Sequence, residues 1–212
     1  MTRAELLINA KPINFQTDMV RAILDGRKTQ TRRPIKSKLD GGVFDYYCRA
    51  GKLQEKTIES NGINSRSKEI VWHEPRYKVG DILYVRETWN YLPLPELLRG
   101  TNRTYFYKAD GYELEDKWKS PANMPKEAAR LFLRVTDVRA EQLQDIRENG
   151  AISEGFAATS RKDQYGTPVD SARCFFGSSW DKRYAKHKGG VHSWDKNPWV
   201  WVYEFERVEI NE

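Results

Sequence analysis

The sequence predicts an α+β fold in which short, mostly antiparallel strands form a barrel with short helices and loop inserts around it. Strand-like segments rich in β-branched and aromatic residues occur at residues 81–89, 129–138 and 198–210. Turn signals such as Gly80-Asp81 stand before them. Loops separate these segments in place of regularly alternating helices, and this favours a barrel over a doubly wound sheet.

The first part of the chain predicts a strand, a helix and an extended segment. A strand is expected from Pro12 to Phe15. Thr17 then offers a helix N-cap, and apolar residues at helical spacing continue to Gly26, where the helix is expected to end. Residues 27–35 are expected to be extended, with Pro34 ending regular strand pairing.

The later part of the chain predicts further short elements between polar inserts. The other expected elements are a strand at 103–110 and helices at 140–146, 148–154 and 171–188. Polar segments at about 36–78, 90–128 and 157–196 are expected to be inserts. The whole chain, residues 1–212, is therefore predicted to be a single domain.

Composition indicates a soluble globular protein, with 39% hydrophobic and 31% charged residues. No segment approaches the roughly 18 consecutive apolar residues of a membrane span, and the N-terminus lacks the apolar core of a signal peptide. We therefore expect a cytoplasmic protein that does not enter a membrane. The sequence has two cysteines, Cys48 and Cys174, and a fold of this size would need more of them to be stabilised by disulfide bonds. Both are expected to be free thiols.

The positive charge is concentrated in residues 21–38. This segment accounts for the whole net charge of +6, because it combines one acidic residue, Asp25, with seven basic ones: Arg21, Arg27, Lys28, Arg32, Arg33, Lys36 and Lys38. A local patch of this sign favours a phosphate-bearing or otherwise anionic partner. The alternative is a solvated basic segment without a ligand.

Four blocks of the sequence resemble the ASCH domain family. They are MVRAILDGRKTQTRRPI, VGDILYVRETW, LQDIRENGAISEGF and NPWVWVYEF. The family signature, G-x-K-x-x-E-x-R, corresponds to Gly26, Lys28, Thr31 and Arg33, with threonine in place of the signature's glutamate. The resemblance implies a PUA-like β-barrel, and the inserts are similar to those of enlarged phage and prophage members.

A small bacterial member of the family, an N4-acetylcytidine amidohydrolase, also has a lysine followed three residues later by threonine, and a glutamate in a later helix. Carried over residue by residue, this resemblance implies that Lys28, Thr31 and Glu154 are catalytic. Glu148 is the alternative to Glu154, because an alignment across short helices can slip.

Amide hydrolysis needs a nucleophile, a base and donors for the developing oxyanion. Thr31 can supply a hydroxyl, and Lys28 can act as the base only in its neutral form, which burial and the neighbouring arginines would favour. Glu154 would orient Lys28 or hold the leaving amine. Attack by a water molecule under Lys28 or Glu154 is the alternative. Residues three apart on a regular strand point to opposite faces, so a bulge or the turn after Gly26 must bring Lys28 and Thr31 together.

The VRETW segment adds candidates for substrate binding. Alternation places Glu87 with the apolar side chains, where it would pair with Arg33 or Lys28, or else form a structural ion pair between strands. Tyr84 and Trp89 are candidates to stack on a base, with a place in the core as the alternative. The expected substrate-binding residues are Gly26, Arg33, Tyr84, Arg86, Glu87 and Trp89.

The leading functional prediction is deacylation of the exocyclic amine of an N4-acylated cytosine, with a modified nucleoside or RNA as partner. The alternatives are an RNA- or nucleotide-binding module and a metal-independent ribonuclease. The histidines lack the spacing of a metal site and neither cysteine has a CxxC partner, so we expect no metal and no cofactor. A monomer is favoured.

Overall fold

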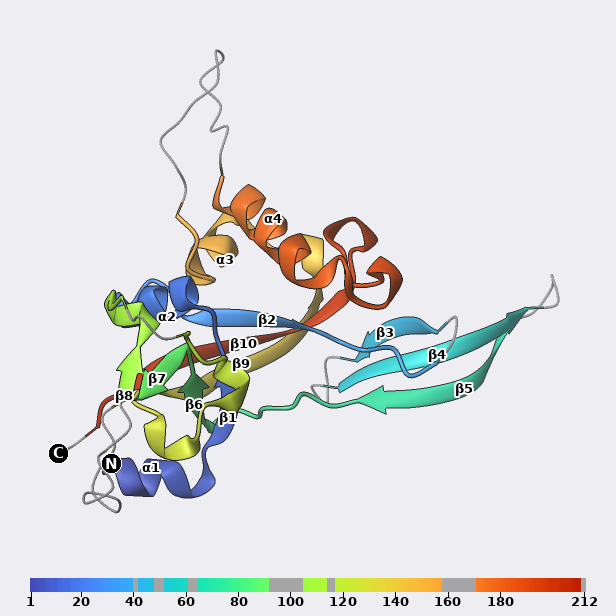
Figure 1. Ribbon diagram of the computed structural model, residues 1–212. Coiled ribbons are helices and arrows are strands. Elements are labelled where there is room, and N and C mark those ends of the chain that lie inside the picture. Colours follow the sequence, from blue (N-terminus) through green and yellow to red (C-terminus); the bar gives the residue numbers. More distant parts are fainter. Residues whose placement is uncertain are drawn as a thin grey trace, which may run out of the picture. The chain divides into compact units, whose positions relative to one another are not determined.

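The computed structural model describes residues 1–39, 42–47, 52–60, 65–91, 105–113, 117–157 and 171–210 (Figure 1). The chain forms two compact units. Unit 1 comprises Met1–Thr29, Gly80–Val135 and Phe205–Glu212, and unit 2 comprises Gln30–Val79 and Thr136–Glu204. Neither unit is a continuous stretch of chain, so each is built from segments that are distant in the sequence.

The described residues contain four α-helices and ten strands. The helices are α1 (Arg3–Asn9), α2 (Thr17–Leu24), α3 (Glu148–Ser153) and α4 (Ala172–Tyr184). The strands are β1 (Lys11–Asn14), β2 (Gln30–Pro34), β3 (Val43–Tyr47), β4 (Lys52–Ser60), β5 (Ser65–His73), β6 (Ile82–Arg86), β7 (Trp89–Tyr91), β8 (Tyr105–Tyr107), β9 (Phe132–Gln142) and β10 (Trp199–Val208). Short 3-10 helices occur in several of the connections.

The strands form open sheets, and an α+β fold is thus confirmed. The largest sheet has the order β1-β6-β9-β10-β2, with β1 and β6 parallel and β6–β9 and β10–β2 antiparallel. β3-β4-β5 and β7-β8 form two smaller antiparallel sheets. A barrel requires the end strands of a sheet to pair with each other. In the described part of the chain β1 and β2 remain the two ends of the strand order, so the predicted closed barrel is not confirmed.

In unit 1, α1 covers β6 and the start of β9. Leu6 and Ala10 pack with Tyr84, Ala129 and Phe132 in one buried cluster. The helix α1 was not predicted, although its start carries a sequence signal. The Thr2 side chain accepts a hydrogen bond from the Glu5 backbone, and the Glu5 carboxylate accepts one from the Thr2 backbone. This capping box satisfies amide groups that the first helical turn leaves open.

The predicted strand at Pro12–Phe15 and the helix after it are both present, as β1 and α2. One detail of the prediction is wrong. The N-cap of α2 is Gln16, whose side chain makes no capping hydrogen bond, and Thr17 is already helical. The buried residues Val20, Ala22 and Ile23 hold α2 through its apolar face. Packing of that face therefore stabilises α2 in the absence of a side-chain cap.

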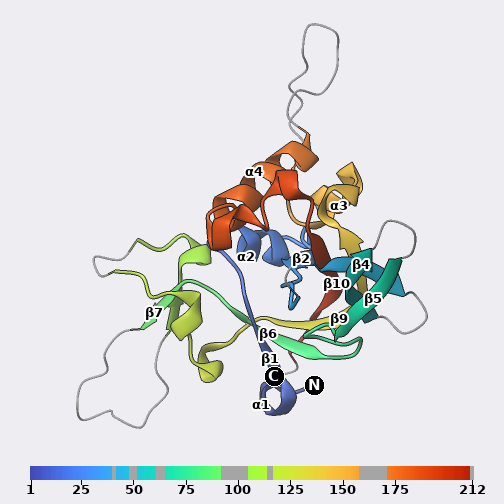
Figure 2. The same cartoon turned by 90° about the vertical axis from the view of Figure 1, so that its right-hand side faces the viewer.

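In unit 2, α3 and α4 lie on one side of the β2–β10 pair (Figures 1 and 2). The apolar side chains between them form one buried cluster. Its members are Leu143, Ile146, Ala151, Ala172, Phe176, Trp180, Val200 and Val202. Val200 and Val202 are two apart on β10, so they point to the same face of the sheet. This face fixes the position of α3 relative to β2.

All three predicted inserts contain regular structure. Residues 36–78 contain the three-stranded sheet β3-β4-β5, which the polar composition did not predict, and β4 and β5 pair with a register shift at Thr57/Ile58. Residues 90–128 contain β8 and most of β7. Within the third segment, α4 agrees with the helix predicted at 171–188.

Cys174 is exposed and free, as predicted, and Cys48 lies outside the described residues. No helix in the described part of the chain is long and apolar enough to cross a membrane.

Candidate functional site

The turn that follows α2 places Lys28 inside unit 1. Gly26 has φ +73°, a conformation that favours glycine, and its amide donates to the Ile23 carbonyl at 3.0 Å. The Lys28 amide donates to the Ala22 carbonyl at 2.9 Å, which folds the chain back over the helix end. Lys28 is 3% exposed, with Nζ 5.4 Å from the centre of the Phe15 ring. The predicted end of the helix at Gly26 thus explains how a lysine of a polar turn becomes buried.

In unit 2, β2 and α3 bring Arg32 and Glu154 together. Glu154 is the C-cap of α3, and its Oε1 lies 3.1 Å from Nη1 of Arg32. Arg32 also contacts Glu141 on β9 at 2.7 Å and lies over the Phe176 ring. Sequence reasoning assigned Arg32 only to the basic segment, because the acidic partners are more than 100 residues away along the chain.

Further polar side chains extend this ion pair into a network. Arg139 contacts Asp137, Glu141 and Glu204 at 2.6 to 3.4 Å. Its Nη2 also donates to the Gln30 side chain at 3.4 Å. Burial alone would lower the pKa of Arg139, yet hydrogen bonds from its guanidinium to Glu204 and Asp137 raise the pKa above its ordinary value. The network therefore holds several charges in place at one end of β2.

Thr31 lies on the other face of β2. In the regular β2–β10 register, Arg32 pairs with Val202 and Thr31 pairs with Tyr203. Directly paired residues share a face, and successive residues alternate between faces. Val202 belongs to the α3–α4 side, so Thr31 and Tyr203 point away from Glu154. β2 is an edge strand of the largest sheet. A ligand could therefore contact both faces of β2 only by reaching around this edge.

The two candidate glutamates, Glu148 in α3 and Glu154 at its C-cap, have different hydrogen-bond partners. The Glu148 carboxylate accepts hydrogen bonds from the amides of Ala172 and Arg173, at 2.6 and 3.2 Å. These amides belong to the first turn of α4, which needs such acceptors. Glu148 therefore has a structural task as a cap of α4, and Glu154 is the better candidate for chemistry.

A cavity of about 320 Å³ opens beside the network at the Gln30 end of β2. Guanidinium, amide and carboxylate groups line it, contributed by Gln30, Arg32, Arg139, Glu141, Asp145, Arg147 and Asn149, together with Gly150 and Ser153. Its volume lies at the small end of the range for ligand pockets. Its lining offers both donors and acceptors, as recognition of the polar edge of a nucleobase requires.

Glu87 is fully buried, but its partner is neither Arg33 nor Lys28. Nε and Nη2 of Arg130 donate to the two carboxylate oxygens at 2.9 and 3.0 Å, and Arg130 also contacts Asp110. Burial raises the pKa of Glu87, although the hydrogen bonds from Arg130 oppose this shift. The pair lies within unit 1, so the structural alternative for Glu87 is the one that its contacts favour.

The two aromatic residues predicted to stack on a base lie in the core. Tyr84 is 4% exposed and Trp89 is 5% exposed. Trp89 packs with Met124 and Ala128, and its Nε1 donates to the Ser120 carbonyl. Arg86 lies over the Tyr84 ring and donates to its hydroxyl at 3.1 Å. Both rings are enclosed by protein atoms, so the stacking role finds no support here.

Two cations of the basic segment 21–38 are not exposed to solvent. Lys28 and Arg32 are buried, and Arg32 is neutralised by two carboxylates. Arg21 donates to the backbone carbonyl of Ala109, and Arg33 is half-buried. Burial removes two of the seven cations from contact with phosphates, which weakens the case for a site that tracks a nucleic-acid backbone.

Within the described ranges, no group of three or more His, Cys, Asp or Glu side chains is placed to hold a metal ion. Comparisons of the chain with protein-family models, curated proteins and solved structures found no match. The case for a function therefore depends on the chemistry of the residues described above and on the sequence resemblance.

Proposed function

We propose that the protein is an amidohydrolase that removes the acyl group from the exocyclic amine of an N4-acylated cytosine. Burial is the observation that carries this proposal. Lys28, Thr31 and Glu154 are 3%, 4% and 4% exposed. A solvated basic turn would instead leave Lys28 and Thr31 in water. The resemblance to the ASCH family selects the same three residues.

The directions in which the side chains of β2 point favour water as the nucleophile. Thr31 points away from Glu154, so we assign to Glu154 the removal of a proton from a water molecule whose oxygen adds to the acyl carbon. The C–N bond then breaks, and the proton passes to the departing amine nitrogen. The products are the carboxylic acid and the cytosine with a free amine. The sequence resemblance assigns Lys28 to the same reaction, in which its ammonium group would stabilise the developing oxyanion.

The cavity near Gln30 supports a nucleobase as the group recognised. Cytosine presents a carbonyl oxygen and a ring nitrogen as acceptors, and guanidinium and amide groups are suitable donors for them. Arg32 and Gln30 belong to both the network and the cavity lining. A substrate bound in this cavity would lie close to the side of β2 on which Glu154 stands.

The test is hydrolysis of N4-acetylcytidine, followed by the ultraviolet change as cytidine forms. Wild-type turnover is expected. Glu154→Gln should lose about 100-fold or more, the usual size of a general acid-base contribution, and Lys28→Ala should lose a similar factor, as when an oxyanion donor is removed. Arg27→Ala and Thr29→Ala are matched controls, because both residues are exposed neighbours of the proposed site residues. Absence of turnover by the folded wild type would overturn the proposal.

Two threonine variants distinguish the nucleophiles. If water attacks, Thr31→Ala keeps measurable turnover and no acyl-enzyme accumulates. If the Thr31 hydroxyl attacks, Thr31→Ala is inactive, Thr31→Ser recovers activity, and mass spectrometry detects the acylated chain. Incubation with RNA completes the design, because strand cleavage in place of deacylation would support a ribonuclease.

A further inference from the structure

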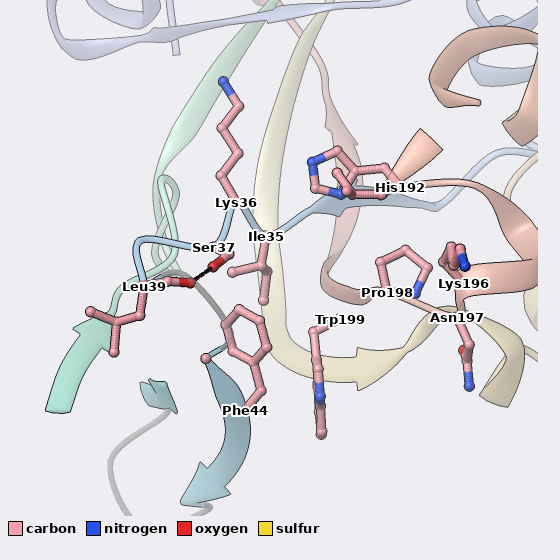
Figure 3. A pocket seen from close by; sticks show the side chains of 12 residues that line it. Ile35, Lys36, Ser37, Leu39, Phe44, His192, Lys196, Asn197, Pro198 and Trp199 are labelled. Carbon is pink, nitrogen blue, oxygen red and sulfur yellow. Dashed lines mark hydrogen bonds between the residues drawn. The ribbon is translucent and has the colours of Figure 1, made fainter. Parts of the chain in front are cut away.

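We propose that a second cavity in unit 2, at the Pro34 end of β2, binds a phosphorylated nucleoside. The cavity has a volume of about 490 Å³ and lies where the chain leaves β2, enters β3 and approaches β10 (Figure 3). This volume is within the range of ligand pockets and accommodates a mononucleotide. None of its lining residues belongs to the Arg32–Glu154 network, so the inference does not depend on the proposed hydrolysis.

One part of the lining is apolar and carries flat rings. Ile35, Phe44, Pro198 and Trp199 contribute their side chains to the cavity wall (Figure 3). Phe44 and Trp199 are partly exposed, unlike the buried rings of Tyr84 and Trp89. A partly exposed aromatic ring in a cavity can stack on a base, because every nucleobase has a π-face.

The charges of the lining favour an anion. Lys36 and Lys196 are exposed, and Figure 3 shows them on different sides of the cavity. Among the described residues that line the cavity there is no aspartate or glutamate. Two ammonium groups at the edge of a cavity attract a phosphate group. Rings for stacking together with cations for phosphate match a nucleotide better than an uncharged nucleoside.

Buried hydrogen bonds hold the wall that follows β2. The carboxylate of Glu55, which is fully buried on β4, accepts hydrogen bonds from the Ser37 hydroxyl and from the amides of Lys38 and Leu39, the latter two at 2.8 and 3.3 Å. His73 on β5 bonds the same carboxylate at 2.8 Å. One carboxylate thus fixes the loop to which the lining residues Lys36 and Ser37 belong.

The opposite wall, before β10, is also fixed. Asn197 has φ +45°, and among the described residues it is the one non-glycine with positive φ. Its side-chain oxygen accepts from the Gln144 amide at 2.8 Å. The Trp180 indole donates to the His192 carbonyl at 2.7 Å. Both walls are therefore preorganised, which reduces the entropic cost of binding a ligand.

The experiment titrates the full-length protein with cytidine monophosphate, cytidine and inorganic phosphate, using ¹⁵N-labelled tryptophan indoles as the reporter. Trp199→Phe identifies the Trp199 signal. We expect a saturable shift of that signal with the monophosphate, and binding about tenfold weaker in the double variant Lys36→Ala/Lys196→Ala, since each exposed ion pair contributes modestly. Lys182→Ala is the matched control, because Lys182 is an exposed lysine of α4 outside the cavity.

The outcomes separate the parts of the proposal. Absence of a saturable shift, or equal affinity of the double-lysine variant and the wild type, would overturn it. Inorganic phosphate binding as tightly as the monophosphate would refute the stacking role, and cytidine binding as tightly would refute the phosphate role. A short single-stranded RNA that binds more tightly than the monophosphate, with the same dependence on both lysines, would identify the nucleotide as part of a strand. The exposed lysines can be replaced without disturbing the core, so loss of fold does not confuse the result.

Discussion

Arg32 and Glu154 form an ion pair whose side chains are only 2% and 5% exposed, with 3.1 Å between Nη1 and Oε1. The two residues lie 122 positions apart in the sequence. Their contact joins β2 to the end of α3 and fixes the carboxylate that we propose as the catalytic base. The pair therefore has a structural and a chemical consequence, and these can be measured separately.

The structural consequence is tested by Arg32→Met. This variant leaves Glu154 and Glu141 without their shared cation in a buried setting, and removal of one partner of a buried pair costs about 3–5 kcal/mol. Urea denaturation measures the change in the free energy of unfolding. Arg134→Met is the control, because the Arg134–Glu206 pair is about half exposed and contributes at most about 1 kcal/mol. Equal losses in both variants would contradict the assignment of Arg32 to the buried network.

The two glutamates of α3 are expected to separate stability from activity. Glu148→Ala removes acceptors for two amides at the start of α4 and should lower the free energy of unfolding by about 1–2 kcal/mol while turnover persists below the melting temperature. Glu154→Gln should abolish turnover and keep most of the stability, because the amide oxygen can still accept from Arg32. Calorimetry measures the stability of both variants, and the N4-acetylcytidine assay measures their turnover. If Glu148→Ala lost turnover and Glu154→Gln kept it, Glu148 would become the catalytic candidate.

Glu55 is expected to make the loop after β2 sensitive to acid. Burial alone would raise the pKa of Glu55, but the hydrogen bonds from Ser37, Lys38, His73 and Leu39 outweigh it and lower the pKa below the ordinary 4.5. A lowered carboxyl pKa contributes stability above pH 4.5 that is lost as the pH falls through the folded-state value.

The matching measurement is thermal unfolding of wild type and Glu55→Gln between pH 3 and pH 7. The variant should be less stable at pH 7, and the difference should shrink as the pH falls below about 4.5. Glu69→Gln on β5 is the control, because Glu69 is exposed. A difference that stays constant over this pH range would show that Glu55 does not titrate as the structure indicates.

Arg130→Met is expected to lower the free energy of unfolding, because the buried carboxylate of Glu87 loses its partner. Burial already raises the pKa of Glu87. A raised carboxyl pKa gives stability that is present below the unfolded-state value and lost as the pH rises through the folded-state value. Without Arg130 the loss at pH 7 should reach about 3–5 kcal/mol and become smaller near pH 4.

A double variant, Arg130→Met/Glu87→Leu, should recover much of that stability, because it also removes the buried charge of Glu87. Urea denaturation of both variants at pH 4 and pH 7 provides the measurement. If the single variant were as stable at pH 7 as at pH 4, the buried charge of Glu87 would not be the source of the loss.

Local patterns in the sequence predicted the elements that depend on local physics. Gly26 ends α2 because its positive φ suits glycine, and alternation of apolar residues predicted β6, β9 and β10. Lys28, whose burial was only a condition of the proposed chemistry, is 3% exposed. In contrast, the sheet β3-β4-β5 was taken for a polar insert, because residues 36–78 are polar overall and rich in Gly, Lys, Ser and Asn.

Tertiary structure decided what depends on partners distant in the chain. Glu87 pairs with Arg130, and Arg32 pairs with Glu154, because sheet register and helix packing bring these charges together in buried positions where only a paired charge is stable. Strand alternation within β2 likewise set Thr31 on the face opposite Glu154. The turn at Gly26 and the extended segments of β6, β9 and β10 could be predicted from local patterns, since these follow from backbone preferences and the spacing of apolar residues. Only the fold determined which polar groups meet, since that depends on burial.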